Sequence, residues 1–173
     1  LTAAEKECSR LLAEKEELVR NIEKKTAEYL LSGAIPGISD VGGDWVILGL
    51  ARGNRLSSSF RKGYYENVVK TLRATGSEKL HRSKSTENSR VILALTSLGY
   101  DASDIAGYNL LAPLADFSYV KKQGLNGSIW ALIAFDSAEY TIPKVTGGTE
   151  GAQQTTREAL LQEILSCQLS SGG

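Results

Sequence analysis

The chain has 173 residues, of which 42% are hydrophobic and 23% charged, and its formal net charge is zero. These values are typical of one globular domain that is long enough to bury a core, and the longest apolar run is far shorter than the ~18 residues that span a bilayer. The charge is uneven, with net −3 over residues 1–51, +7 over residues 52–90 and −4 over residues 91–173. The basic middle carries no recognisable nucleic-acid-binding motif. We therefore interpret it as solvated helix faces and loops, with a surface for an anionic partner as the alternative.

The few residues that could bind a metal are scattered. Cys8 and Cys167 are far apart and match no metal-ligand spacing, and His81 is the one histidine, which argues against a protein-only zinc site. A disulfide would require the termini to meet, so two free thiols are expected, and His81 is expected to be exposed. Because the chain begins with Leu1 rather than Met and ends in Ser-Gly-Gly, we expect both ends to be cut, which leaves room for a lost export signal.

The first predicted element is one long helix over residues 3–31. This segment is rich in Glu, Lys, Ala and Leu, which are good helix formers, and Glu–Lys pairs at spacings of three and four add support. A coiled-coil arm is the alternative interpretation, and Gly33, Pro36 and Gly37 end the helix. The apolar face at helical spacing comprises Leu11, Leu12, Leu18, Val19 and Ile22.

An apolar repeat follows along the chain. The segments ILGLARG, ILALTSLG and ALIAFDSA place Leu50, Leu95 and Ile133 in register, at steps of 45 and 38 residues. Each segment precedes an amphipathic one, and a period of ~40 residues with two helices per unit indicates a solenoid or a closed helical ring. The third segment has seven consecutive apolar residues, from Ile129 to Phe135. A helix that is apolar on every side is expected to be surrounded by protein.

These patterns predict an all-α protein, and specifically an α/α toroid in the form of a partial or half ring. The helix over residues 1–31 would pack on or lead into the toroid, which would occupy residues 32–173. Buried parallel strands are the alternative, but the apolar runs favour Ala, Leu and Gly over β-branched residues, and no Gly-rich phosphate loop follows them. The predicted inner helices cover residues 44–53, 88–99 and 127–138, capped by Asp44, by Asn88 or Ser89, and by Asn126 or Ser128; the predicted outer helices cover 59–75, 110–122 and 153–169.

The last segment, REALLQEILSCQLSSGG, resembles the QW repeat of the terpenoid cyclase and prenyltransferase superfamily, with Arg157, Gln168 and Gly172 in matching places. The segments GGDWVILGLARG, SRVILALTSLGYD, GYNLLAPLADF and KKQGLNGSIWALIAFDS look like the toroid domain of Gram-positive surface proteins, described as a prenyltransferase or squalene-oxidase repeat and related in fold to vitamin B12 carriers and complement C3d. The resemblance covers about residues 25–173. It implies a secreted, cell-surface location, and it implies that the Gln168 amide and the Gly172 turn tie an outer helix to the next inner helix.

The catalytic motifs of that superfamily are absent from this sequence. Asp101 and Asp104 have the wrong spacing for the Asp-x-Asp-Asp acid of terpene cyclases and are better explained by a cap or turn. Cys167 and His81 lack the context of the prenyltransferase zinc ligands. We therefore predict no catalytic residue, no metal and no cofactor, and lean against an enzyme.

What remains is a possible binding lumen whose rim would lie at the amino ends of the inner helices. Helix amino ends offer free N–H groups, and tryptophans are common anchors in ligand pockets. The structural alternatives are core packing for the tryptophans, capping for Asp44 and Asn126, and an ion pair of Arg90 with Asp136 or Asp116. The predicted rim residues are Asp44, Trp45, Arg90, Tyr108, Asn109, Gln123, Asn126 and Trp130.

The leading interpretation of function is a non-catalytic ligand-binding or scaffold module of an exported bacterial cell-surface protein. An apolar or corrinoid-like small molecule is the expected ligand. Because an open half-ring exposes apolar edges, we also expect the remaining half of the toroid, a partner domain or a homodimer. The alternative is an enzyme acting on an isoprenoid or another apolar substrate, with its catalytic acids outside this chain. A third possibility is a structural spacer with a filled lumen.

Overall fold

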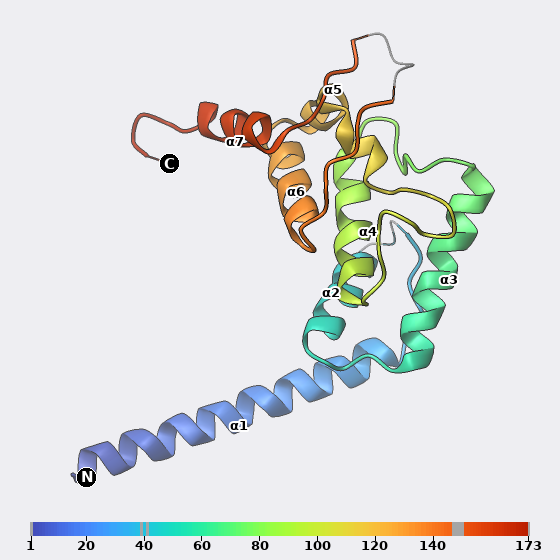
Figure 1. Ribbon diagram of the computed structural model, residues 1–173. Coiled ribbons are helices and arrows are strands. Elements are labelled where there is room, and N and C mark those ends of the chain that lie inside the picture. Colours follow the sequence, from blue (N-terminus) through green and yellow to red (C-terminus); the bar gives the residue numbers. More distant parts are fainter. Residues whose placement is uncertain (1, 39, 41, 147–150, 173) are drawn as a thin grey trace. The chain divides into compact units, whose positions relative to one another are not determined.

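The computed structural model describes residues 2–38, 40, 42–146 and 151–172. The chain divides into two compact units, residues 1–35 and 36–173, and each is described by itself. The described residues form α-helices and 3₁₀-helices with two isolated bridges and no strand, which confirms the all-helical class. In chain order the elements are α1 (Ala3–Leu31), α2 (Gly43–Arg52), α3 (Ser58–Thr75), α4 (Ser85–Ser97), η1 (Ala112–Ala115), α5 (Phe117–Val120), η2 (Lys121–Gln123), α6 (Gly124–Asp136) and α7 (Arg157–Ser166) (Figure 1).

The first unit is the helix α1, which covers the range in which the sequence predicts a helix. A capping box starts it: the Thr2 hydroxyl accepts a hydrogen bond from the Glu5 amide at 3.2 Å, and the Thr2 amide donates to the Glu5 carboxylate at 2.7 Å. Such reciprocal caps satisfy amide groups that have no partner within the helix. Ion pairs along the helix, such as that of Lys24 with Glu28 at 3.9 Å, add a few tenths of a kcal/mol each.

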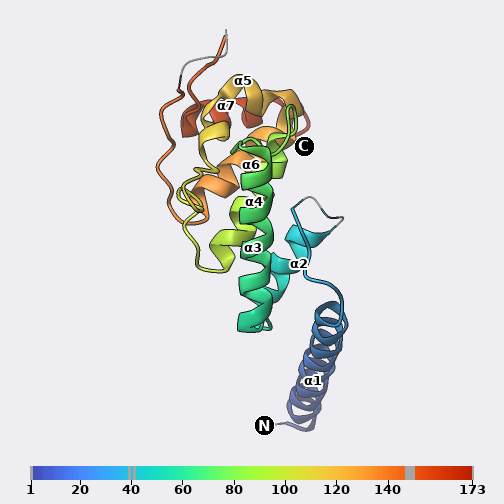
Figure 2. The same ribbon diagram turned by 90° about the vertical axis from the view of Figure 1, so that its right-hand side faces the viewer.

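The second unit is built around α2, α4 and α6, which run in the same direction in Figure 1, with α4 in contact with both of the others. α3 runs the opposite way, and Figure 2, which looks onto α3, shows it in front of α4. Two contacts attach α3 to the end of α4: the Arg61 guanidinium donates to the Leu98 carbonyl, and Tyr65 stacks on Tyr100 with ring centroids 4.3 Å apart. The core lies between these helices, and its largest fully buried side chains include Ile47, Tyr64, Leu72, Ile92, Leu95, Leu114, Tyr119, Phe135 and Leu160.

The predicted outer helix over residues 110–122 is wrong as a continuous helix. The segment is broken into η1, α5 and η2, with Asp116 in an extended conformation between the first two. The reason lies far along the chain. The Phe117 amide donates to the Gln153 carbonyl at 2.7 Å, and the Thr155 amide donates to the Ala115 carbonyl at 2.8 Å. This pairing replaces helical hydrogen bonds on both sides, so the last helix also begins at Arg157 rather than at residue 153 as predicted.

The predicted caps of the inner helices are also wrong. α2 is capped by Gly42 in a left-handed conformation, and Asp44 lies in the first turn. α4 begins three residues earlier than predicted, at Ser85. The Asn88 side chain does not cap it and instead accepts from the Leu80 amide at 3.1 Å and donates to the Glu78 and Leu110 carbonyls. α6 begins at Gly124, so Asn126 and Ser128 lie inside its first turns.

The apolar run of α6 is only partly enclosed. Ala131, Ala134 and Phe135 are fully buried, but the Ile133 side chain is 42% exposed and Trp130 is half-buried. The expectation of a helix surrounded on every side is therefore wrong for the described part of the chain. Leu95, the residue in register with Ile133 on α4, is fully buried, because α4 packs against both α2 and α6.

Two helical glycines, Gly127 and Gly49, are expected to respond in opposite ways to substitution by alanine. A Cβ atom on Gly127 would lie 2.0 Å from the Val120 carbonyl oxygen, whereas a Cβ atom on Gly49 meets nothing within 4 Å. We expect Gly127→Ala to lower the free energy of unfolding by about 1–3 kcal/mol or more, because backbone must move. Gly49→Ala should raise it by up to ~1 kcal/mol through the higher helix propensity of alanine. Denaturant unfolding of both variants checks this, and a neutral Gly127→Ala would show that α6 does not sit this close to Val120.

Candidate functional site: a buried carboxylate beneath a tryptophan pair

The start of α2 carries a carboxylate that three helices hold in place. Asp44 is 2% exposed. Its Oδ1 atom accepts a hydrogen bond from the Tyr64 hydroxyl of α3 at 2.7 Å, and its Oδ2 atom lies 3.3 Å from Nε of Arg90 on α4. Arg90 also donates to the Glu87 carboxylate at 2.6 Å. One guanidinium is thus shared by two carboxylates, and the cluster ties the first turn of α2 to both neighbouring helices.

Burial dominates the electrostatics of this cluster. Loss of hydration raises the pKa of the Asp44 carboxyl above its ordinary 3.8, and the Glu87 charge acts in the same direction. The Tyr64 hydrogen bond and the charge of Arg90 oppose this rise without cancelling it. Burial, followed by the negative charge of Asp44, raises the pKa of the Tyr64 hydroxyl well above its ordinary value. The hydroxyl therefore remains a hydrogen-bond donor at every physiological pH.

The two tryptophans of the chain lie together beside this cluster. The rings of Trp45 on α2 and Trp130 on α6 have centroids 4.9 Å apart and are tilted by 56°, which is a favourable aromatic geometry. Trp45 is 39% exposed, and Ile133 follows Trp130 one turn along α6. We call Trp45, Trp130 and Ile133 the apolar edge. Sequence reasoning proposed both tryptophans as rim residues, and the structure brings them into direct contact.

Among the other predicted rim residues, Gln123 and Asn109 bind backbone amides. The Gln123 side chain accepts a hydrogen bond from the Thr86 amide at 2.8 Å and so satisfies the start of α4. The Asn109 side chain accepts from the Leu111 amide at 3.0 Å, and Tyr108 pairs with Ile105 in the same loop. Asn126 is exposed in the first turn of α6. The structure thus groups Asp44, Trp45, Arg90 and Trp130 and gives Gln123 and Asn109 local roles.

The sequence-based expectation for the ion pair of Arg90 is wrong. Arg90 pairs with Asp44 and Glu87, not with Asp116 or Asp136. Asp116 instead caps α5, accepting from the Ser118 amide at 3.0 Å. Asp136 pairs with Arg157 at 2.8 Å.

His81 is half-buried rather than exposed. Its Nδ1 atom accepts from the amides of Ser83 and Lys84 at 3.1 and 3.0 Å, so it organises the turn before α4. Its carbonyl accepts a hydrogen bond from the Tyr119 hydroxyl at 2.6 Å.

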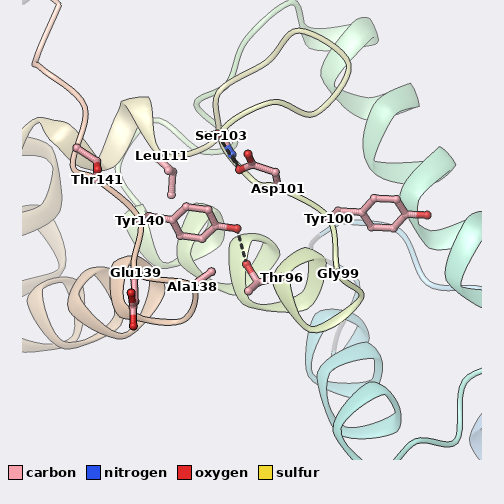
Figure 3. A pocket seen from close by; sticks show the side chains of 10 residues that line it. All are labelled: Thr96, Gly99, Tyr100, Asp101, Ser103, Leu111, Ala138, Glu139, Tyr140 and Thr141. Atoms are coloured by element: carbon pink, nitrogen blue, oxygen red, sulfur yellow. Dashed lines mark hydrogen bonds between the residues drawn. The ribbon is translucent and has the colours of Figure 1, made fainter.

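A groove of about 580 Å³ lies at the opposite, carboxyl ends of α4 and α6 (Figure 3). The Tyr140 ring crosses it, with its hydroxyl 2.9 Å from the Thr96 hydroxyl and accepting from the Ala102 amide at 3.1 Å. Asp101 on its wall accepts from the Ser103 hydroxyl and amide, which lowers the pKa of the Asp101 carboxyl. Sequence reasoning missed this groove because Tyr140 follows α6 in a segment with no recognisable pattern.

The remaining chemistry-bearing residues are dispersed. Cys8 and Cys167 are free thiols, both exposed. Over the described residues no group of three or more His, Cys, Asp or Glu side chains could hold a metal ion. None of the described helices combines the length and apolar character needed to cross a membrane.

Comparison with known proteins adds no family to this picture: no family model, curated protein or solved structure matches the chain. The site must therefore be interpreted from its own geometry. A buried carboxylate held by a tyrosine and an arginine is suited to fixing helices together, and the aromatic and aliphatic side chains beside it are suited to apolar contact.

The contribution of the Tyr64–Asp44 hydrogen bond to stability can be tested by removing the Tyr64 hydroxyl oxygen. Tyr64→Phe leaves the Asp44 carboxylate without its shortest hydrogen bond in a buried place, so we expect the free energy of unfolding to fall by about 1–3 kcal/mol. Tyr65→Phe is the matched control, because it removes the same atom from the next residue, whose ring stacks on Tyr100. Chemical denaturation of both variants measures the difference. Equal, small effects would contradict a structural role for the Tyr64–Asp44 bond.

The raised pKa of Asp44 predicts a specific pH dependence. Because the folded-state pKa lies above the unfolded value near 3.8, the folded protein holds the proton more tightly. The contribution of Asp44 to stability is therefore present at low pH and is lost as the pH rises through the folded-state pKa. We expect the free energy of unfolding of the natural protein, relative to that of Asp44→Asn, to fall as the pH rises from about 3.8 upward. Parallel pH profiles, or a rising difference, would contradict the prediction.

Proposed function

We propose that this chain is a non-catalytic ligand-binding or scaffold module of an exported bacterial cell-surface protein, built as part of an α/α toroid. The observation that carries the proposal is the apolar edge of Trp45, Trp130 and Ile133, which is exposed next to a polar cluster that is already satisfied. Apolar side chains grouped in this way mark a surface for a ligand or for another part of a protein.

The arrangement of the second unit supports the toroid. The inner helices α2, α4 and α6 run in one direction (Figure 1), and each is followed in the sequence by a segment that packs outside it. α3 contacts the start of α2 and the end of α4, η1 and α5 pack on α4, and α7 packs on α6. Alternating inner and outer helices with this connectivity are the building plan of a two-layer helical ring.

The QW-like end of the chain agrees with the same plan. Arg157 is the first residue of α7, and its guanidinium binds the Asp136 carboxylate and donates to the Tyr140 carbonyl at 3.0 Å. It thereby fastens the start of an outer helix to the end of the inner helix before it. The Gln168 amide reaches the Gly172 carbonyl at 3.5 Å. The cell-surface location rests on the resemblance of the repeat segments to surface-protein toroids.

The state of Asp44 supports a non-catalytic role. Its two oxygens are engaged by Tyr64 and Arg90, and its side chain is 2% exposed. A carboxylate so placed holds α2, α3 and α4 together. A reacting substrate would have to displace the contacts that fix the fold. The apolar edge, in contrast, is accessible without any rearrangement.

The apolar edge can be tested through its own fluorescence, since Trp45 and Trp130 are the two tryptophans of the chain. We expect farnesol, as an isoprenoid probe, or cobinamide, as a corrinoid probe, to change the tryptophan emission saturably. Ile133→Asp should abolish this change, and circular dichroism should show that the variant keeps its helices, because the Ile133 side chain is partly exposed. Gln162→Asp is the control, because it adds the same charge at an exposed polar position of α7, outside the apolar edge.

A self-association that Ile133→Asp reverses would equally support the proposal, with a second copy covering the edge. The contrary result has two parts: neither probe changes the emission, and Ile133→Asp leaves the native mass unaltered at every concentration. The apolar edge would then be bare surface of a spacer, and the binding proposal would fail.

A further inference from the structure

The helix α1 carries an apolar stripe that nothing in its own unit covers. Over residues 2–35 the unit consists of this helix and a short segment without regular structure, and the ion pairs along the helix run between residues on its polar sides. A 29-residue helix is about 44 Å long, and the stripe occupies the part of it from Leu11 to Tyr29. Its large side chains are 44–78% exposed: Leu11, Leu12, Leu18, Val19, Ile22 and Tyr29.

The stripe follows a seven-residue repeat. Leu11 and Leu18 are one heptad apart, and Cys8, Ile22 and Tyr29 fall at the complementary positions of the same seam. Alternation of three and four residues places such side chains along one line that a partner helix can fill. Leu12 and Val19 lie directly beside the seam and make the apolar face of α1 broader on that side.

Two lysines within the seam decide the orientation of a partner. Lys15 and Lys25 occupy seam positions of this heptad repeat. In a parallel, in-register pair each would face its own copy, which sets like charges against each other. In an antiparallel pair centred between residues 16 and 17, Lys15 faces Leu18 of the second copy and Lys25 faces Cys8 of the second copy. The antiparallel arrangement also places Leu11 opposite Ile22 in two layers.

The charges of α1 are complementary in the same orientation. Residues 3–17 carry five acidic and three basic groups, and residues 18–31 carry two acidic and three basic groups. Antiparallel pairing therefore sets a net −2 half against a net +1 half. Lys25 then lies within one helical turn of Glu5 and Glu7 of the second copy, and Lys15 lies within about one turn of Glu14 of the second copy. Opposed helix dipoles add to this preference.

We propose that α1 is a self-association arm, which pairs antiparallel with α1 of a second copy of this chain through the seam of Leu11, Leu18 and Ile22. The inference is independent of the apolar edge on α2 and α6. The two surfaces can be tested by different substitutions, so failure of one leaves the other standing.

The seam is tested first by Ile22→Glu in the full chain. Ile22 faces Leu11 of the second copy, so a charge there should lower the association constant at least tenfold, measured by sedimentation equilibrium. Ala13→Glu is the matched control, because Ala13 is exposed on the opposite side of α1 and receives the same charge. Circular dichroism confirms that both variants keep their helices. A chain that is a single copy at all concentrations, or a dimer that Ile22→Glu does not weaken, overturns the proposal.

The orientation is tested by cross-linking in a Cys167→Ser background. Antiparallel pairing separates the two Cys8 thiols by ~25 Å, so Cys8 alone should give no disulfide-linked dimer on mild oxidation with copper phenanthroline. Adding Lys25→Cys should give a dimer that joins Cys8 to the introduced thiol and disappears when Cys8→Ser is added. Lys24→Cys, one residue away and off the seam, should give none. Efficient cross-linking through Cys8 alone would establish a parallel pair and overturn the proposed orientation.

Discussion

The second unit is organised around one buried, hydrogen-bonded carboxyl group, that of Asp44. Asp44 is withdrawn from water at the start of α2, and an unpaired carboxylate there would cost several kcal/mol. The Tyr64 hydroxyl and the Arg90 guanidinium offset part of that cost from two different helices. Loss of either partner would leave the buried carboxyl group with one contact fewer, so the cluster links α2, α3 and α4.

The packing of α2 and α6 on α4 determines where apolar surface remains. With α2 and α6 both packed on α4, Trp45 and Trp130 meet, and their rings shield each other only in part. Ile133 is 42% exposed although α6 packs on both α4 and α7. The apolar character of α6 is nearly uniform around the helix, so the face that carries Ile133 is apolar surface that the described chain leaves uncovered.

The broken segment between η1 and η2 shows how distant chain can override a local pattern. Residues 110–122 have apolar side chains at helical spacing, yet two hydrogen bonds to residues 153–155 capture backbone groups that a helix would use. If residues 110–122 formed a continuous helix, the Gln153 carbonyl and the Thr155 amide would lose these partners. Exchanging helical hydrogen bonds for these two therefore costs little free energy. The same pairing delays the start of α7. Arg157 then anchors that start to Asp136.

The sequence by itself determined the long helices and their apolar faces, but not the broken segment over residues 110–122, because helix propensity and the spacing of apolar residues act within a few residues along the chain. It also identified Trp45, Trp130, Asp44 and Arg90 as candidate site residues near the starts of α2, α4 and α6. Only the tertiary structure decided that Asp44 and Arg90 bind each other and that the tryptophans touch. It also decided that Asn88, a predicted helix cap, forms hydrogen bonds with backbone groups outside its helix. These outcomes depend on which distant groups compete for the same buried hydrogen bonds, and residue spacing carries no information about that competition.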